Sequence, residues 1–284
     1  MQGAVIWSFE FVNKKRQIMN RDPIRYFVVD AFTDQPFSGN PAAVVPLSKW
    51  REDAWLQDVA MEMNLSETAF LVSNEHGFDL RWFTPLVEVD LCGHATLAAA
   101  FVISQSGLQA EGSEIKFSTR GGALNASLQQ GRIQLDFPLK PESRTEPPIE
   151  LLQGLAIQPK YVGRNEFDYL VEVESEAEVR EMVPDFKRLS DVDCRGIIVT
   201  SRSKDPRFDF VSRFFGPAVG VDEDPVTGSA HCCLADFWRK RMEKDTFVAF
   251  QASSRGGVVH ITIQRDRVLL GGQAVMVAQG ELLL

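Results

Sequence analysis

The sequence FTPLVEVD, residues 83–90, returns in altered form as FGPAVGVD at residues 215–222. The two octets share the pattern F-x-P-x-V-x-V-D, and each leads through a glycine, Gly93 or Gly228, into a run of small residues. The repeat predicts two similar lobes, each with a strand before the glycine and a helix after it. A ligand would then bind between the lobes, where the two helix N-termini face each other.

The run after Gly93, residues 94–103 (HATLAAAFVI), is apolar on every side, which is typical of a helix buried within a lobe. The matching helix is expected at residues 229–239. We therefore predict an α+β fold of two pseudo-symmetric lobes, each a mostly antiparallel β-sheet curled around one central α-helix. An amphipathic helix is predicted at residues 52–63, and strand patterns occur at residues 25–32, 42–46, 68–73, 78–83, 115–119, 123–128, 132–137, 168–173, 196–200, 208–214, 247–251, 258–263 and 268–270.

The lobes are expected at residues 23–137 and 138–284, because residues 138–148 are rich in proline and charge and form the best linker candidate. The last strand, within residues 273–283, can return to the first lobe. Residues 1–22 are expected to form a poorly ordered extension. A targeting peptide, or a functional start at Met19, is the alternative interpretation of that segment.

Composition narrows the function classes. The chain of 284 residues is 44% hydrophobic and 24% charged, which is typical of a soluble globular protein. Its net charge of −9 argues against nucleic acid or an anionic membrane as partner, but it leaves room for a small anionic substrate. Four cysteines without a C-x-x-C pair or a secretory signal favour a reducing, cytoplasmic compartment.

Each glycine-led helix start is a potential anion site, because the first turn of a helix has unpaired N–H groups and a partial positive charge. Gly93 with His94, and Gly228 with Ser229, would supply two such sites for a carboxylate or a developing enolate. The ordinary alternative is a plain capped helix, which is the fate of most such sequences.

Two sets of acidic residues are candidates for proton chemistry. Glu67 stands at the start of an apolar strand, where a partly desolvated carboxylate is suited to take and return a proton. Asp224 closes the run DED at residues 222–224, just before the second helix, and one acid of that run can face the ligand or His94. The ordinary interpretations are a solvated edge residue for Glu67 and compensation of the helix dipole for the run.

Metal, thiol and nucleotide chemistry are less well supported. The spacings C-x-H at residues 92–94 and H-C-C at residues 231–233 are not those of zinc ligand pairs. A two-cysteine racemase needs a thiol at each helix start, and only Cys92 fits, since Thr227, Gly228 and Ser229 occupy the second place. No G-x-G-x-x-G or Walker pattern occurs, so a nucleotide cofactor is not expected. Because of the ligand spacings, a metal is not expected either.

Five blocks carry a family resemblance: DAFT and GNPAAV at residues 30–33 and 39–44, NLSETAF at 64–70, CGHATL at 92–97, DEDPVTGSAH at 222–231 and QASSRGG at 251–257. In this order they resemble the phenazine-biosynthesis PhzF-like isomerase family, within the diaminopimelate-epimerase-like superfamily. The resemblance runs from about Ile24 to the C-terminus. It implies the two-lobed fold, a homodimer, and acid–base isomerisation without metal or cofactor.

By motif position, the resemblance implies that Glu67 carries the proton and that His94 and Asp224 orient the substrate and assist proton movement. It also implies that Gly93, Gly228 and Ser229 bind a substrate carboxylate. Arg255, in the last block, is a further candidate for either substrate contact or a structural role. The Cys-Gly-His-Ala form resembles a broad branch of the family whose substrates are mostly undefined. The phenazine substrate is therefore not carried over.

Two other interpretations stay open. One is a metabolite-binding or protein-interaction member of the same fold that has lost turnover. The other is a thiol-dependent epimerase that uses Cys92.

Overall fold

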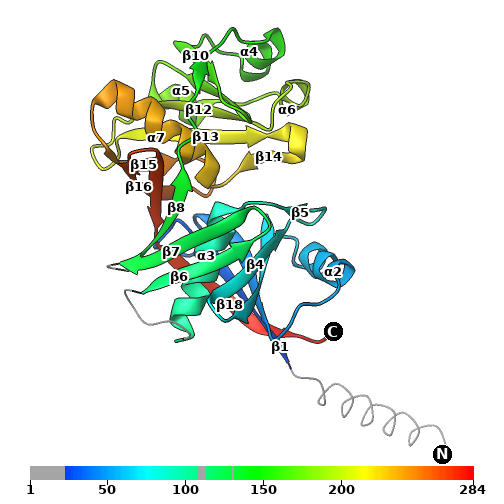
Figure 1. Cartoon of the computed structure of the whole chain (residues 1–284). Helices are drawn as coiled ribbons and strands as arrows, with labels where there is room; N and C mark the ends of the chain where they lie inside the picture. The colour runs from blue at the N-terminus through cyan, green and yellow to red at the C-terminus, as the bar shows by residue number, and fades with distance from the viewer. Residues whose placement is uncertain (1–22, 108–112, 130) are drawn as a thin grey trace, which may run out of the picture.

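The computed structural model describes residues 23–107, 113–129 and 131–284, so the expectation for residues 1–22 lies outside the described residues. Two lobes lie one above the other, with the early elements in one and most of the later elements in the other (Figure 1). Within the described residues, both lobes contribute strands to one sheet of 18 strands.

The N-terminal lobe contains β1 (Ile24–Ala31), β2 (Asn40–Leu47), α2 (Asp53–Met63), β3 (Glu67–Asn74), β4 (Gly77–Phe83), β5 (Glu88–Val89), α3 (Gly93–Gln105), β6 (Glu114–Thr119), β7 (Gly122–Gln129) and β8 (Arg132–Pro138). The C-terminal half contains β9 (Ser143–Arg144), α4 (Ile149–Leu155), β10 (Tyr161–Arg164), β11 (Asp168–Glu172), α5 (Glu176–Glu181), α6 (Phe186–Leu189), β12 (Gly196–Arg202), β13 (Phe210–Gly216), η1 (Pro217–Val219), β14 (Val221–Asp224), α7 (Gly228–Met242), β15 (Thr246–Gln251), β16 (Gly257–Gln264), β17 (Arg267–Gly272) and β18 (Ala274–Leu282).

The strand pairing of the first lobe is repeated in the second. In the first lobe, β1–β2 and β3–β4 are antiparallel, whereas β2–β3 and β4–β6 are parallel. In the second lobe, β10–β11 and β12–β13 are antiparallel, whereas β11–β12 and β13–β15 are parallel. The parallel pairs were not expected from the strand patterns; they follow from the helical crossovers, since parallel neighbours need a long connection. The sheet is therefore mixed, although most of its pairs are antiparallel.

The duplicated octets occupy equivalent places in this pattern. Phe83 closes β4 and lies opposite Thr68 of β3, while Phe215 in β13 lies opposite Ile197 of β12. Each octet continues through a short strand, β5 or β14, into its glycine-led helix, α3 or α7. The repeat thus positions both helix starts at the same edge of their lobes, and both edges face the junction.

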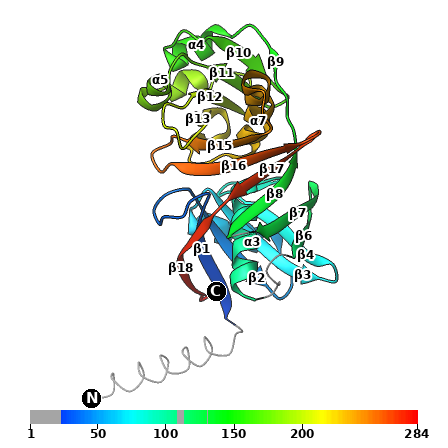
Figure 2. The same cartoon turned by 90° about the vertical axis from the view of Figure 1, so that its left-hand side faces the viewer.

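Two exchanges of strands join the lobes. β8 pairs with β17 antiparallel across the junction (Figure 2), and β18 returns to pair with β1 over its whole length. The linker candidate, residues 138–148, is instead packed into the second lobe: β9 pairs with β10, and Lys140 N–H donates to Cys232 O at 3.2 Å. The chain passes between the lobes as paired strands.

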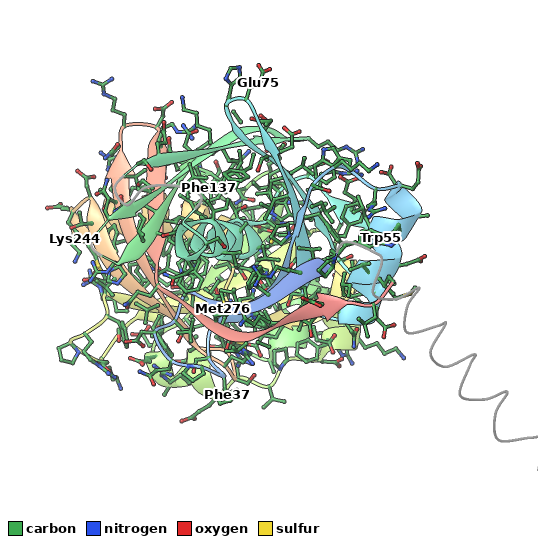
Figure 3. All side chains as sticks on the ribbon, turned by 90° about the horizontal axis from the view of Figure 1, so that it is seen from below. Phe37, Trp55, Glu75, Phe137, Lys244 and Met276 are labelled. Carbon is green, nitrogen blue, oxygen red and sulfur yellow. The ribbon has the colours of Figure 1, made fainter. Side chains whose placement is uncertain are left out.

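Each lobe is built around its predicted helix. α3 is buried along almost its whole length, and its run of alanines lets the surrounding strands pack closely. In Figure 3 α3 is seen nearly end-on, with Phe137 of β8 and Met276 of β18 on different sides of it. α7 is the matching helix of the second lobe, and both contribute to one hydrophobic core that is continuous across the junction.

Candidate active site

The first residue of β3 brings a carboxylate to the junction between the lobes. Asn64 ends α2 in a left-handed conformation, with φ of 50°, and the chain then enters β3 at Glu67. The Glu67 side chain is 18% exposed, so it is accessible to a ligand but largely removed from water. Its Oε2 lies 3.1 Å from Nε2 of His94, the second residue of α3.

That contact is close but not a well-directed hydrogen bond. Oε2 of Glu67 and Nε2 of His94 are both buried, and among the described residues neither has a partner with hydrogen-bond geometry. The two atoms are near enough for their charges to interact, and Oε2 of Glu67 can still accept a hydrogen bond.

The two helix starts meet beside this pair. A methyl group added to Gly93 would lie 3.5 Å from the Cα atom of Gly228, and the reverse also holds, so the two glycines are neighbours. Among the described residues no side chain caps either helix, and neither first turn contains an acid. Gly93 and Ser229 are partly exposed, whereas Gly228 is buried. The arrangement leaves two helix N-termini with N–H groups that an anion can bind.

Asn40, the first residue of β2, links His94 to the second lobe. Its Nδ2 donates to Asp224 Oδ1 at 2.8 Å and to the backbone oxygen of Val226 at 3.0 Å, and it lies 3.1 Å from Nδ1 of His94. A backbone oxygen only accepts, so the amino end of this amide must face Val226. Asp224 and Val226 take both hydrogens of Nδ2, so the contact with Nδ1 of His94 does not by itself decide which ring nitrogen carries a hydrogen. Asn40 is fully buried, so the bridge is shielded from water.

Asp224 is held on its second oxygen as well. Thr227 Oγ1 donates to Asp224 Oδ2 at 2.5 Å, and the amide of Gln251 contacts both Thr227 and the Asp224 backbone. Asp224 therefore lies at the junction, and its hydrogen bond to Asn40 connects it to His94. The neighbouring Glu223 is occupied by Arg213 at 2.7 Å and is not a site residue.

Arg255 makes contacts within the protein. Its guanidinium pairs with the buried Asp30 at 2.8 Å and donates to the backbone oxygens of Gly39 and Ser38. These bonds fix the loop between β1 and β2, which carries Asn40 at its end. Arg255 thus supports the loop that leads to Asn40.

The pKa shifts follow from this packing. Burial raises the pKa of Asp224, and burial raises the pKa of the Cys92 thiol to about 11, so Cys92 is uncharged near neutral pH. Burial disfavours a charged His94, but its neighbours Cys92 and Glu67 raise the pKa of His94 well above its ordinary range. Because a thiol with so high a pKa carries no charge near neutral pH, we attribute that rise to the Glu67 carboxylate.

Glu67, Cys92 and His94 hold donor atoms within 4.8 Å of one another, a spacing at which metal ligands also occur. Here the donors diverge. Cys92 Sγ lies 3.5 Å from Nδ1 of His94, whereas Glu67 approaches Nε2 on the other side of the ring. The two ring lone pairs point apart, so one ion cannot bind all three side chains in this arrangement. His231 lies elsewhere, with its Nδ1 2.8 Å from Thr227 O and burial lowering its pKa to about 4.

The second lobe carries no acid at the place equivalent to Glu67. Gly196 begins β12 there, and a methyl group on it would lie 2.1 Å from Cζ of Phe214. The ring of Phe214 thus fills that space. Despite the duplicated fold, only the N-terminal lobe has a carboxylate at the start of this strand.

Sequence reasoning brought Glu67, His94, Gly93, Gly228, Ser229 and Asp224 to one junction, but it left out three residues of the hydrogen-bond network. These are Asn40, Thr227 and Gln251, all buried. Asn40 and Gln251 were visible as polar residues at the ends of predicted strands, within blocks GNPAAV and QASSRGG. A polar amide next to an apolar strand is the signal that could have found them.

Comparison with known proteins identifies the family. The family model described as "Phenazine biosynthesis-like protein" matches residues 29–280. A protein of Halalkalibacterium halodurans described as an uncharacterized isomerase is 55% identical over 91% of this chain and 98% of its own length. A crystal structure of a phenazine biosynthesis PhzF family protein from Enterococcus faecalis superposes with a TM-score of 0.88 at 39% identity, covering 92% of this chain and 99% of that one.

The chain therefore belongs to the phenazine biosynthesis-like PhzF family, and it is an isomerase of that family. A probable proline racemase from Agrobacterium radiobacter shares the fold at 9% identity, with a TM-score of 0.63 over 91% of this chain and 92% of that one. Within the described residues, no helix is both long and apolar enough to cross a membrane.

Proposed function

We propose that this protein is a cofactor-independent isomerase that moves a proton on a small carboxylate-bearing metabolite, with Glu67 as the general acid and base. The observation that carries the proposal is the position of the Glu67 carboxylate, 3.1 Å from His94 and beside two uncapped helix starts. A proton carrier and an anion site at one junction are the two parts that such a reaction needs.

Substrate binding is assigned to the helix starts. Backbone N–H groups at Gly93, Gly228 and Ser229 would hold the substrate carboxylate and the negative charge that develops on it. The helix dipoles favour that charge, and burial at the junction strengthens the interaction. On an acidic protein such a local site supplies the attraction that the overall charge does not.

The proton step uses one carboxylate twice. Glu67 as a carboxylate takes a proton from a substrate carbon: a C–H bond breaks, an O–H bond forms, and the electron pair stays on the substrate as a delocalised carbanion. Glu67 then returns the proton to another carbon of the same face, which restores the carboxylate. The raised pKa of His94 favours the protonated ring, which has a hydrogen on Nε2 and orients Glu67, while Asp224 holds His94 in place through Asn40.

Several wider features belong to the same proposal. The two lobes are taken as the pseudo-symmetric halves of the diaminopimelate-epimerase-like fold, on the strength of their repeated strand pairing. The functional unit is taken as a cytoplasmic homodimer without nucleic-acid or membrane partners. Four free cysteines agree with a reducing location.

A solvent-exchange screen tests the proposal. Wild-type protein is incubated in deuterium oxide with small cyclic and amino-acid-derived carboxylates, and deuterium incorporation is measured by mass spectrometry. We expect at least one ligand to exchange with wild type, and Glu67→Gln to abolish that exchange. Asp58→Asn, which removes an exposed carboxylate of α2, serves as the control. Ligands that bind without exchange would favour the non-catalytic alternative.

A further inference from the structure

The junction contains two carboxylates, Glu67 and Asp224, with opposite hydrogen-bonding environments. Asp224 accepts on both oxygens, from Asn40 at 2.8 Å and from Thr227 at 2.5 Å. Oε2 of Glu67 accepts no hydrogen bond from the described residues. Donated hydrogen bonds stabilise the ionised form of a carboxylate, so the two acids are not equivalent as proton acceptors.

The direction of the Thr227 hydroxyl is fixed by Gln251. Oε1 of Gln251 accepts from the Thr227 backbone N–H at 2.8 Å, and Nε2 donates to the Asp224 backbone oxygen at 2.7 Å. A backbone N–H only donates and a backbone oxygen only accepts, so this amide has one possible orientation. Nε2 of Gln251 also lies 3.2 Å from Thr227 Oγ1 and donates to it, which directs the single hydroxyl hydrogen toward Asp224.

We propose that Thr227 is a positioning residue that keeps Asp224 ionised, so that the proton moved in the reaction is held by Glu67. The effect on catalysis rests on the proposed function, whereas the hydrogen bonds of Thr227 do not depend on it. Without the donated bond, two carboxylates in one partly desolvated site would share one proton. Thr227 and Asn40 remove that ambiguity by giving Asp224 two donors, whereas Oε2 of Glu67 accepts no hydrogen bond from the described residues.

Other charged groups at the junction do not substitute for this bond. His94 from α3 and Glu67 from β3 face Asp224 and act on its charge in opposite directions, and burial raises its pKa. On β14 the adjacent Glu223 is neutralised by Arg213 at 2.7 Å. The hydroxyl of Thr227 is therefore the donor within the second lobe that opposes protonation of Asp224.

The test is a titration of Asp224 in the ligand-free protein. Aspartate is labelled with carbon-13 at Cγ, the carboxyl resonances are followed by NMR between about pH 3 and pH 8, and the Asp224 signal is assigned by its loss in Asp224→Asn. Thr227→Val removes the hydroxyl at constant shape, and Thr227→Ser keeps it. We expect the Asp224 midpoint to move to higher pH in Thr227→Val and to stay with wild type in Thr227→Ser.

Two results would overturn the inference: an unchanged midpoint in Thr227→Val, or equal shifts in both variants. Thermal unfolding checks that both variants fold. If Thr227→Val does not fold, Thr227→Ala replaces it in the same titration. Because no ligand is needed, the titration stands even if the exchange screen finds no substrate. With an exchanging ligand, Thr227→Val should lose roughly tenfold or more in rate at low pH, with recovery as the pH rises, and Thr227→Ser should retain the wild-type profile.

Discussion

Replacing Asn40 by aspartate should destabilise the protein, and the loss should grow as the pH rises. Asn40→Asp keeps the shape of the side chain but puts a carboxyl oxygen where Nδ2 now donates to Asp224 at 2.8 Å and to Val226 O at 3.0 Å. Two acceptors then face the introduced group. Its carboxyl must either carry a charge against Asp224 or hold a proton.

The size of the effect is set by the cheaper of these two states. Two unit charges 2.8 Å apart repel by roughly 6 kcal/mol at an effective dielectric constant of about 20. Holding a proton instead costs about 1.4 kcal/mol for each pH unit above an ordinary carboxyl pKa of about 4, which is about 4 kcal/mol at pH 7 and about 1.4 kcal/mol at pH 5. Protonation is the cheaper state, so the folded form binds the extra proton. By linkage, the stability relative to wild type falls as the pH rises from about 4.

The assay is urea unfolding followed by circular dichroism at pH 5 and pH 7, with the free energy of unfolding compared with wild type at each pH. Asn125→Asp is the matched control, because Asn125 is exposed on β7 opposite Lys116. The control should change stability by no more than about 0.5 kcal/mol at either pH. Equal penalties for Asn40→Asp at the two pH values would refute the bridge between Asn40 and Asp224.

Two further variants test other parts of the structure. Gly196→Ala should lower the free energy of unfolding by about 1–3 kcal/mol, because the added methyl would lie 2.1 Å from Phe214 and force its buried ring to move; a wild-type melting temperature would contradict the packing at that place. Cys92→Ala should keep any solvent-exchange activity, since burial raises the pKa of this thiol to about 11; loss of exchange in a folded variant would revive the thiol-dependent epimerase.

Much of this fold could be predicted because the sequence contains an internal repeat, with one copy in each lobe. The octets at residues 83–90 and 215–222 located both central helices, and α3 and α7 begin at the predicted glycines. The short elements α4, α5 and α6 were not predicted. They are only four to seven residues long, too short to form as isolated helices, and burial against the second lobe's own core decides their conformation.

The site was predictable to the level of residue types but not of contacts. Glu67, His94 and Asp224 were singled out from their places next to strands and helix starts. Asn40 and its partner Asp224 are 184 positions apart in the chain. The Gln251 amide binds Thr227 and Asp224, which are 24 and 27 positions away from it. Such pairings arise from the way the lobes pack, which no local pattern contains.

The central claim is that Glu67 moves the proton. The most direct measurement compares wild type with Glu67→Gln for deuterium incorporation into one bound carboxylate ligand, with its dissociation constant measured by calorimetry. The account predicts that exchange falls by about a hundredfold or more while the dissociation constant changes only a few-fold, because the helix starts still bind the anion. Exchange in Glu67→Gln at the wild-type rate would contradict it.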